Sequence, residues 1–447
     1  MDLFIKLSQF LLSLSLLIIL HELGHFIPAK LFKTRVEKFY LFFDVKYSLL
    51  KKKIGETEYG IGWLPLGGYV KISGMIDESM DKEQMALPPQ PWEFRSKPAY
   101  QRLIIMLGGV TVNFILAFII YIGMAFAYGE TYVANSDFQD GMLINNPVMQ
   151  EAGFKTGDKI IAADGEKIAR FDNDITMKLI MSRKVLIERD GKEQEIALPV
   201  DLVDRLSQYE KTNLIDIRMP FVIGAVEDDS PNTTLQPKDL ITSLNGQPTK
   251  YFDQAEIILA NSKGKTIPAT ILRDQKEQNI TLKISKEGTV GVQRGGLTID
   301  NLEKLGYYKI SKQEYSFMES IPVGLTKGKD QLIGYGKQLK MIFNPQTKAY
   351  KQVGGFKAIF DIFPETWSWE TFWRITALLS IMLGVMNLLP IPALDGGHVM
   401  FLLYEIISGK KPSDKFLENA QVVGFVLLIT LLLFANGNDI YKAIVGR

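Results

Sequence analysis

The chain has 447 residues, none of them cysteine, and its 51 basic and 50 acidic residues give a net charge of +1. It is too long for one ordinary domain, and its balanced charge gives no reason to expect a nucleic-acid partner. Without cysteine, disulfides, thiol catalysis and cysteine-ligated metal are excluded, so any metal site must use His, Asp or Glu. Only three histidines are present, His21, His25 and His398.

The first predicted element is an apolar helix over residues 3–32. It has no small-residue cleavage site of a signal peptide and continues directly into the sequence HELGH, residues 21–25. Positions i and i+4 of a helix share a face, so His21 and His25 can bind one Zn²⁺ while Glu22 acts on a water as general base. Ionisable groups within a membrane span are costly and therefore indicate function. The alternative is a histidine pair at a helix end that reaches the lipid headgroups.

Three further apolar stretches complete a predicted set of four membrane spans, at residues 103–127, 375–394 and 422–435. Basic residues are concentrated between the first and second stretches and between the third and fourth. The positive-inside rule assigns both connections to the cytoplasm, so the N-terminus and residues 128–371 face the other side. For each stretch the alternative is a buried helix of a large soluble protein.

Residues 132–288 contain an internal repeat with alternating, strand-like patterning. Asn146-Pro147 leads to GDKIIAADG at 157–165, and Ser230-Pro231 leads to KDLITSLNG at 238–246. This pattern resembles a tandem of PDZ domains, which capture a peptide end or strand by β-augmentation. The predicted boundaries are 132–220 and 221–288, and the alternative is two unrelated small β units.

The predicted architecture is therefore an α-helical polytopic membrane protein with two inserted α+β PDZ-like domains. Residues 1–131 form the N-terminal membrane part and residues 372–447 the C-terminal one. Residues 289–371 are predicted to form a linker, with amphipathic helices near 330–343 and 356–363 that can lie on the membrane surface.

A catalytic zinc needs a third protein ligand and one open position. Asp395 lies in NLLPIPALDGGH, residues 387–398, at the predicted cytoplasmic end of the third span. The His21–His25 pair lies at the cytoplasmic end of the first span and so at a similar depth. His398 and Glu405 are rival ligands on chemical grounds, and the sequence by itself leaves the choice open.

The combination of HELGH in a first span with NLLPIPALDGGH in a third resembles the site-2 protease family. The PDZ-like tandem between the second and third spans is similar to its bacterial RseP-type branch, the regulator-of-sigma-E proteases. The resemblance implies one Zn²⁺ per chain held by His21, His25 and Asp395, with Glu22 as the catalytic carboxylate. It also implies that Asn387 positions the substrate or supports the oxyanion, and that His398 is at most auxiliary to the metal.

Two more segments match this family. Residues 58–74 (EYGIGWLPLGGYVKISG) resemble its membrane-associated β-hairpin, which implies substrate-binding roles for Gly67, Gly68 and Tyr69. The alternative is a plain surface hairpin. Residues 109–113 match the family's G-P-x-x-N stretch, with Val110 where proline is usual, and Asn113 is an auxiliary candidate.

The function that the resemblance implies is zinc-dependent cleavage of single-span membrane proteins, such as anti-sigma factors or remnant signal peptides, within the lipid bilayer. The substrate would already be shortened by another protease, and the PDZ-like domains would act as a filter. The expected location is the bacterial inner membrane, with the PDZ-like domains in the periplasm and the active site near the cytoplasmic side. The alternative is a membrane-bound PDZ scaffold with a structural zinc closed by four ligands.

Overall fold

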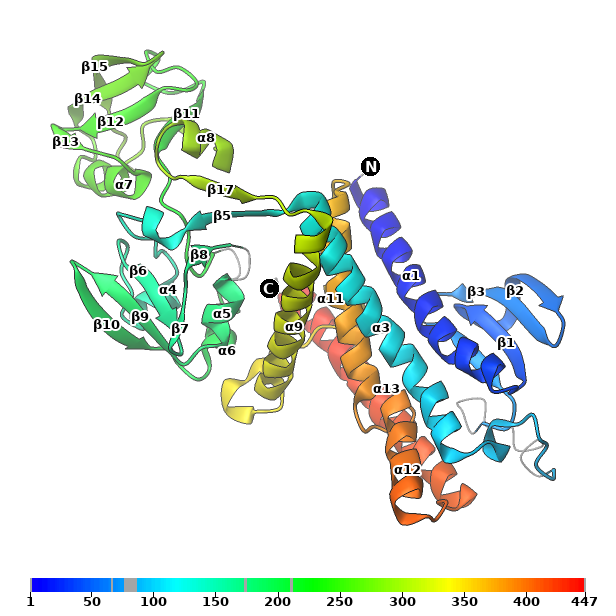
Figure 1. The fold of residues 1–447 in the computed structure, drawn as a ribbon. Coiled ribbons are helices and arrows are strands. Elements are labelled where there is room, and N and C mark those ends of the chain that lie inside the picture. The colour runs from blue at the N-terminus through cyan, green and yellow to red at the C-terminus, as the bar shows by residue number, and fades with distance from the viewer. Residues whose placement is uncertain (1, 66, 76–86, 173–174, 210–211, 446–447) are drawn as a thin grey trace. The chain divides into compact units, whose positions relative to one another are not determined.

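A computed structural model describes residues 2–65, 67–75, 87–172, 175–209 and 212–445 (Figure 1). The chain divides into two compact units. The first comprises Met1–Gly129, Glu314–Pro345 and Ala349–Arg447, and the second comprises Glu130–Gln313 and Gln346–Lys348.

The first unit is mainly helical. Its helices are α1 (Asp2–Leu31), α3 (Ala99–Tyr128), α9 (Phe317–Ile342), α10 (Phe356–Asp361), α11 (Trp369–Leu388), α12 (Asp395–Ser408) and α13 (Asp414–Val445), with short 3₁₀ turns η1 (Phe94–Ser96) and η4 (Ala349–Gln352). Among the described residues, α1, α3, α11 and α13 are long and apolar enough to cross a membrane. These four helices contain most of the four predicted spans.

The third span differs from its prediction, because α11 ends at Leu388 instead of continuing to residue 394. Pro390 and Pro392 follow, and proline disfavours helical backbone both at its own position and at the residue before it. A separate helix, α12, which the sequence did not predict, then begins at Asp395.

Glycines allow the helices of this unit to pack closely. A Cβ atom on Gly108 of α3 would lie 1.9 Å from the carbonyl oxygen of Gly24 in α1, so these two backbones touch. A Cβ atom on Gly324 of α9 would lie 2.5 Å from the backbone of Ile122 in α3. The helix predicted near 330–343 is therefore part of a 26-residue helix that packs along α3.

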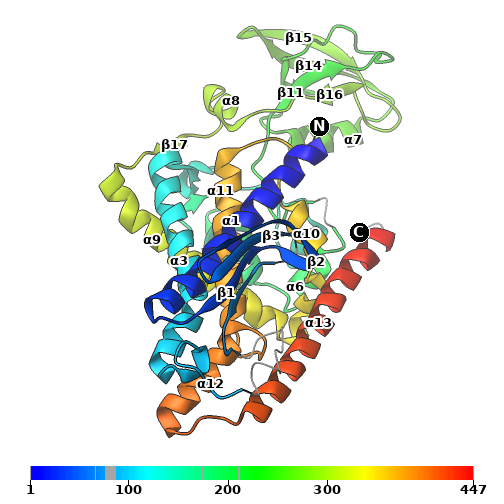
Figure 2. The ribbon, with the colours of Figure 1, turned by 90° about the vertical axis from the view of Figure 1, so that its right-hand side faces the viewer.

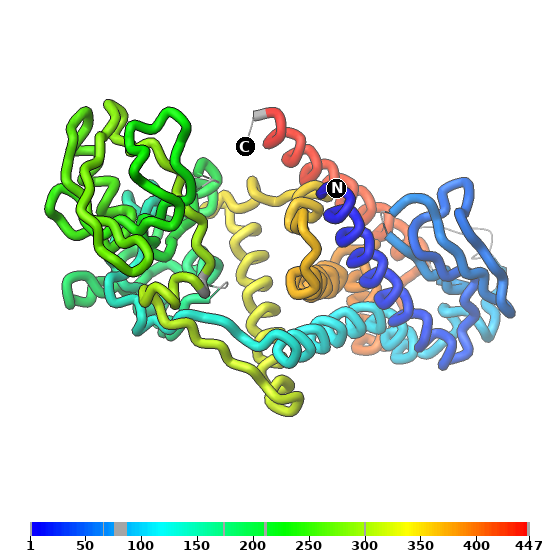
Figure 3. Tube along the Cα trace, turned by 90° about the horizontal axis from the view of Figure 1, so that it is seen from above, coloured from blue at the N-terminus to red at the C-terminus, as the bar shows by residue number. Residues whose placement is uncertain are grey.

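A four-stranded sheet lies beside α1 (Figures 2 and 3). Its strands are β1 (Val36–Leu41), β2 (Phe43–Ile54), β3 (Thr57–Leu64) and β4 (Tyr69–Ile72), in the order β2-β3-β1-β4. The predicted hairpin over 58–74 is wrong, because β1 lies between β3 and β4 and pairs with both. The hairpin is instead formed by β2 and β3, and β4 is an edge strand. Alternation over residues 58–74 predicted β3 and β4 but not β1, whose Val36 and Tyr40 are fully buried within the sheet.

The second unit is built from short strands and helices. Its strands are β5 (Glu130–Ala134), β6 (Lys159–Ala163), β7 (Glu166–Lys167), β8 (Arg170–Phe171), β9 (Lys184–Arg189), β10 (Lys192–Ala197), β11 (Phe221–Val226), β12 (Leu240–Leu244), β13 (Gln247–Pro248), β14 (Thr266–Arg273), β15 (Lys276–Lys283), β16 (Val292–Arg294) and β17 (Ile310–Gln313). Its helices are α4 (Pro147–Glu151), α5 (Ile175–Met181), α6 (Leu202–Leu206), α7 (Phe252–Asn261) and α8 (Ile299–Lys304).

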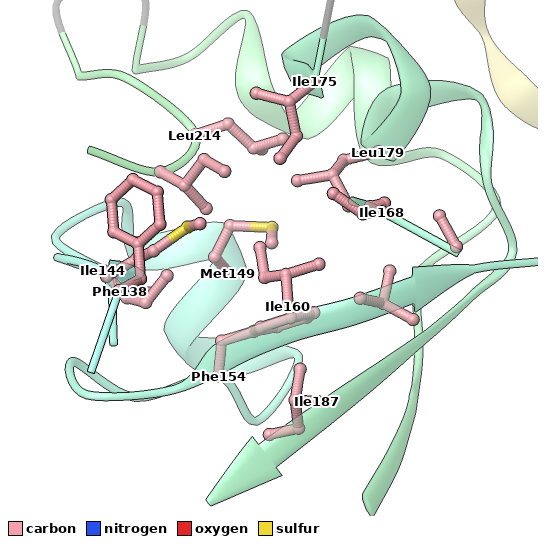
Figure 4. Packing of buried hydrophobic residues seen from close by; sticks show 14 of the residues in the cluster. Phe138, Ile144, Met149, Phe154, Ile160, Ile168, Ile175, Leu179, Ile187 and Leu214 are labelled. Atoms are coloured by element: carbon pink, nitrogen blue, oxygen red, sulfur yellow. The ribbon is translucent and has the colours of Figure 1, made fainter. Parts of the chain in front are cut away.

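These strands form three sheets, ordered β10-β9-β6-β7, β15-β14-β12-β11-β16 with β13 beside β12, and β17-β5-β8. One hydrophobic core surrounds Phe138, Met149 and Ile160 (Figure 4), and a second surrounds Phe221, Ile241 and Leu259. Residues 289–313, expected to begin a linker, form β16, α8 and β17 and belong to this unit.

The sequence repeat is matched by a repeated ion pair. Asp158 accepts a hydrogen bond of 2.7 Å from Nε of Arg189, and Asp239 accepts one of 2.7 Å from Nε of Arg273. Both aspartate side chains are only 1% exposed. Each carboxylate also accepts a 2.8 Å bond from the backbone N–H three residues before it. The two halves therefore use the same buried contact to fix the turn before the repeated strand.

We expect Asp239→Ala to destabilise the half around β11–β15 by about 1–3 kcal/mol, because it removes the buried carboxylate that accepts hydrogen bonds from the Gln236 N–H and from Arg273. Pulse proteolysis of the full chain in increasing urea measures this loss. Asp229→Ala, which removes an exposed carboxylate, is the matched control and should change stability by less than about 0.5 kcal/mol. Equal stability of the two variants would contradict a structural role for the pair.

Tyr251 links the two cores. It directly precedes α7 of the second core, yet its side chain is buried in the first, where its hydroxyl donates to Asp140 at 2.8 Å. A hydrogen bond from Lys250 holds the pKa of the Asp140 carboxyl below its usual value. Arg218 donates to the Asp140 carbonyl at 3.0 Å and pairs with Asp253 in α7. The two halves therefore share one polar junction.

Candidate active site

Three side chains predicted to bind a metal converge in the first unit. His21 and His25, both buried, project from one face of α1, and their Nε2 atoms lie 3.3 Å apart. Oδ2 of Asp395, the first residue of α12, lies 3.4 Å from Nε2 of His21 and 3.3 Å from Nε2 of His25. In the described part of the chain, no other group of three His, Asp or Glu side chains converges in this way.

Glycines at the start of α12 and within α3 allow this approach. A Cβ atom on Gly396 would lie 2.3 Å from the Leu389 carbonyl oxygen, so the tight turn between α11 and α12 has no room for a side chain there. A Cβ atom on Gly109 of α3 would lie 2.4 Å from Nε2 of His25. Since position 109 has no side chain, α3 packs directly against the two imidazole rings.

The hydrogen bonds behind the rings fix their orientation. Nδ1 of His25 lies 2.8 Å from the Ile105 carbonyl oxygen, which only accepts, so Nδ1 carries the proton and Nε2 presents its lone pair. Nδ1 of His21 lies 3.0 Å from the Asn113 side-chain amide, whose buried Oδ1 atom has no hydrogen bond to any residue that the structure describes. When the Asn113 amide is assigned with its oxygen and nitrogen exchanged, Oδ1 accepts a hydrogen bond from Nδ1–H of His21. The lone pair on Nε2 of His21 then also faces the cluster.

The donor set fits a zinc ion. The His25 lone pair faces the Asp395 carboxylate, whose buried Oδ2 atom accepts no hydrogen bond among the described residues, so a positive charge is needed between them. Two nitrogens and a carboxylate oxygen form a common zinc-binding set. Ligands about 2.0–2.1 Å from a tetrahedral zinc lie about 3.3–3.4 Å from one another, which is the spacing of these three atoms.

Other predicted site residues surround the cluster. Glu22 is partly buried, and a Cβ atom on Gly68 would lie 3.4 Å from its Cγ atom, so the chain leading into β4 passes over Glu22. Nδ2 of Asn387, near the end of α11, lies 3.3 Å from Nε2 of His21. Gly67 lies against the Phe43 ring, and the Tyr69 hydroxyl donates to Asp44 at 2.8 Å within the sheet. Of the four predicted substrate-binding residues, Gly68 lies against Glu22 and Asn387 lies beside His21.

The rival ligands are not in the cluster. His398 lines a small cavity of about 60 Å³ together with Arg102 and Glu405. Glu405 accepts a 2.5 Å hydrogen bond from Arg102. Geometry therefore separates Asp395 from both alternatives that the sequence left open.

Sequence reasoning missed the Ile105 carbonyl, the Gly24–Gly108 contact and the close packing of Gly109 on the rings. The Gly108-Gly109 pair within an apolar helix was the available signal, because small residues at such a position indicate close helix packing. A backbone carbonyl leaves no trace in the sequence.

Comparison with known proteins gives matches along almost the whole chain. The model of Peptidase family M50 matches residues 9–431. A Campylobacter jejuni protein that bears the name of a zinc metalloprotease is 29% identical over 440 residues, covering 97% of this chain and 92% of its own length. The regulator of sigma-E protease RseP of Escherichia coli is 27% identical over 464 residues, covering 97% and 98%. A solved PDZ domain of an SdrC-like protein from Listeria monocytogenes, 26% identical, matches 19% of this chain and 90% of its own, with a TM-score of 0.16.

The family match includes all three residues of the cluster and at least part of each of the four span-length helices. The two relatives named as proteases align with this chain over more than nine-tenths of their length. The chain therefore belongs to peptidase family M50, the site-2 proteases, and is a membrane-embedded metalloendopeptidase.

Proposed function

We propose that this chain is a zinc-dependent intramembrane endopeptidase that cuts single-span membrane proteins, such as anti-sigma factors or remnant signal peptides. One observation carries the proposal: the ligand atoms of His21, His25 and Asp395 lie 3.3–3.4 Å apart, with both histidines on the span-length helix α1 and Asp395 shortly after the span-length helix α11. These residues would hold one zinc per chain, near the cytoplasmic side of the inner membrane.

Each residue has a defined chemical task. His21, His25 and Asp395 would hold the zinc, which would supply Lewis-acid chemistry to the scissile carbonyl and to a water. Glu22 takes a proton from the attacking water and returns it to the leaving amine. The side-chain amide of Asn387, close to His21, donates a hydrogen bond to the substrate carbonyl oxygen as negative charge develops there.

A catalytic role is favoured over a scaffold with structural zinc. A structural zinc is normally closed by four protein ligands. The described residues supply three, and His398 lies in a separate cavity, so one position is left for water and substrate. Membership of a peptidase family supports the same choice.

The substrate would bind as an added strand on β4. This strand is an edge of its sheet, and the residue before it, Gly68, lies against Glu22. Helical backbone is closed to attack because its carbonyls are hydrogen-bonded, so the substrate must unwind first. Pairing with a free strand edge satisfies the exposed backbone groups of the unwound segment.

The second unit is proposed as a periplasmic filter that admits substrates already shortened by another protease. The strands at which this unit begins and ends suggest a test. Glu130 of β5 pairs with Gln313 of β17, so the two ends of residues 131–312 lie close together. Replacing 131–312 by a short Gly-Ser linker should leave the first unit intact.

We expect the wild-type chain, reconstituted in liposomes, to cut only a reporter with a shortened ectodomain. The deletion variant should cut the long and short reporters at similar rates, with mass spectrometry placing the cut within the apolar segment. A zinc chelator should stop both reactions. A deletion variant that cuts the short reporter and leaves the long one intact would exclude the filter.

A further inference from the structure

A line of buried polar side chains extends from the cluster toward the N-terminus of α1. Gln9, Ser13 and His21 are separated by multiples of four residues and therefore lie along one face of this helix. All three side chains are buried. Ser13 lies eight residues before His21, about 12 Å along the axis. Neither Gln9 nor Ser13 has a part in the proposed chemistry.

The contacts of this stripe are made with α11 and the segment before it. Oγ of Ser13 lies 2.9 Å from Oγ1 of Thr376. The Thr376 hydroxyl donates to the Phe372 carbonyl of its own helix at 2.8 Å, so Ser13 is the donor between the two helices. One turn before Ser13, Nε2 of Gln9 donates to the Pro364 carbonyl at 2.9 Å.

The same side of α11 continues to the active site. Ser380, one turn after Thr376, donates to the Asn113 backbone carbonyl at 2.7 Å, and the Asn113 side chain contacts His21. Asn387, seven residues later, also contacts His21. The polar contacts of α11 thus connect α1, α3 and the histidines in one series.

Hydrophobic burial does not by itself set the rotation of α1 about its axis. Its side chains are apolar on the exposed side, as at Leu7 and Leu12, and on the buried side, as at Leu17. In lipid both sides are solvated equally well, so there is no hydrophobic preference for one rotation. A buried hydroxyl that must find a partner does impose such a preference, as single polar residues do in helical bundles.

We propose that the Ser13–Thr376 hydrogen bond, supported by Gln9, locks the rotation of α1 and so aims His21 and His25 at Asp395. Ser13 and Thr376 are positioning residues, which act on the metal through the helix that carries its ligands. The inference rests on the proposed zinc site and goes beyond it by assigning the source of its geometry.

The test compares zinc affinity of the purified full-length chain, measured by chelator competition, across matched variants. Ser13→Ala, Thr376→Val and the double variant should each weaken zinc binding by about 3- to 10-fold, with the double variant no worse than the singles because one bond is lost in all three. The exchange Ser13→Thr with Thr376→Ser keeps both hydroxyls and should restore the affinity. Ser8→Ala and Thr111→Val are controls, since each of these hydroxyls donates to a carbonyl of its own helix, that of Phe4 and of Leu107 respectively.

A second readout is independent of zinc. Because the chain has no cysteine, His21→Cys with Asp395→Cys introduces one thiol pair that a short bifunctional reagent can bridge. Adding Ser13→Ala should lower the bridging yield, and adding Ser8→Ala should not. Unchanged zinc affinity and unchanged bridging in the Ser13 and Thr376 variants would overturn the inference. If Ser13→Ala lowered the bridging yield but the wild-type chain bound no zinc, the role of Ser13 in orienting α1 would stand and the proposed zinc site would be overturned.

Discussion

Glu22→Gln is expected to fold, retain zinc and lose cleavage by a factor of about 10²–10⁴. Glutamine has the shape of glutamate but cannot take a proton from the attacking water. Glu22 follows His21 directly in α1 and lies against Gly68. Its carboxylate can therefore act on a water without itself binding the metal. A single-turnover rate with the shortened reporter, together with zinc per chain, separates the chemical step from metal loss.

The control for this variant is Glu370→Gln, which makes the same exchange at an exposed residue in the first turn of α11. It should cut at the wild-type rate. If Glu22→Gln cut within tenfold of the wild type, another group would have to be the general base.

Asp395→Ala is expected to lower zinc affinity by at least about 100-fold, while His398→Ala keeps one zinc per chain. The reason is geometric: Oδ2 of Asp395 lies within 3.4 Å of both Nε2 atoms, whereas His398 lines the cavity beside Arg102. Metal analysis after dialysis against a weak chelator provides the measurement. Retention of zinc by Asp395→Ala together with its loss from His398→Ala would reverse the assignment.

Local patterns in the sequence predicted the elements better than their partners. Residues 58–74 were expected to form a hairpin because they alternate around Gly67-Gly68, and they do contain most of β3 and all of β4. Alternation does not encode which strand lies alongside, and β1 occupies the place between them. The contact between Gly68 and Glu22 consequently comes from the segment before an edge strand and not from the tip of a hairpin.

By itself the sequence predicted a pair of metal ligands on one face of a single helix. The spacing of His21 and His25 fixes their common face, the lack of cysteine limits the ligands, and apolar length predicts four spans, because each of these properties is local to a few turns of helix. Only the tertiary structure brought Asp395, and not His398 or Glu405, beside the two histidines, added α12, and connected His25 to the Ile105 carbonyl. Those outcomes depend on contacts between residues about 80 to 370 positions apart, made possible where glycines bring backbones together, and no local periodicity records such contacts.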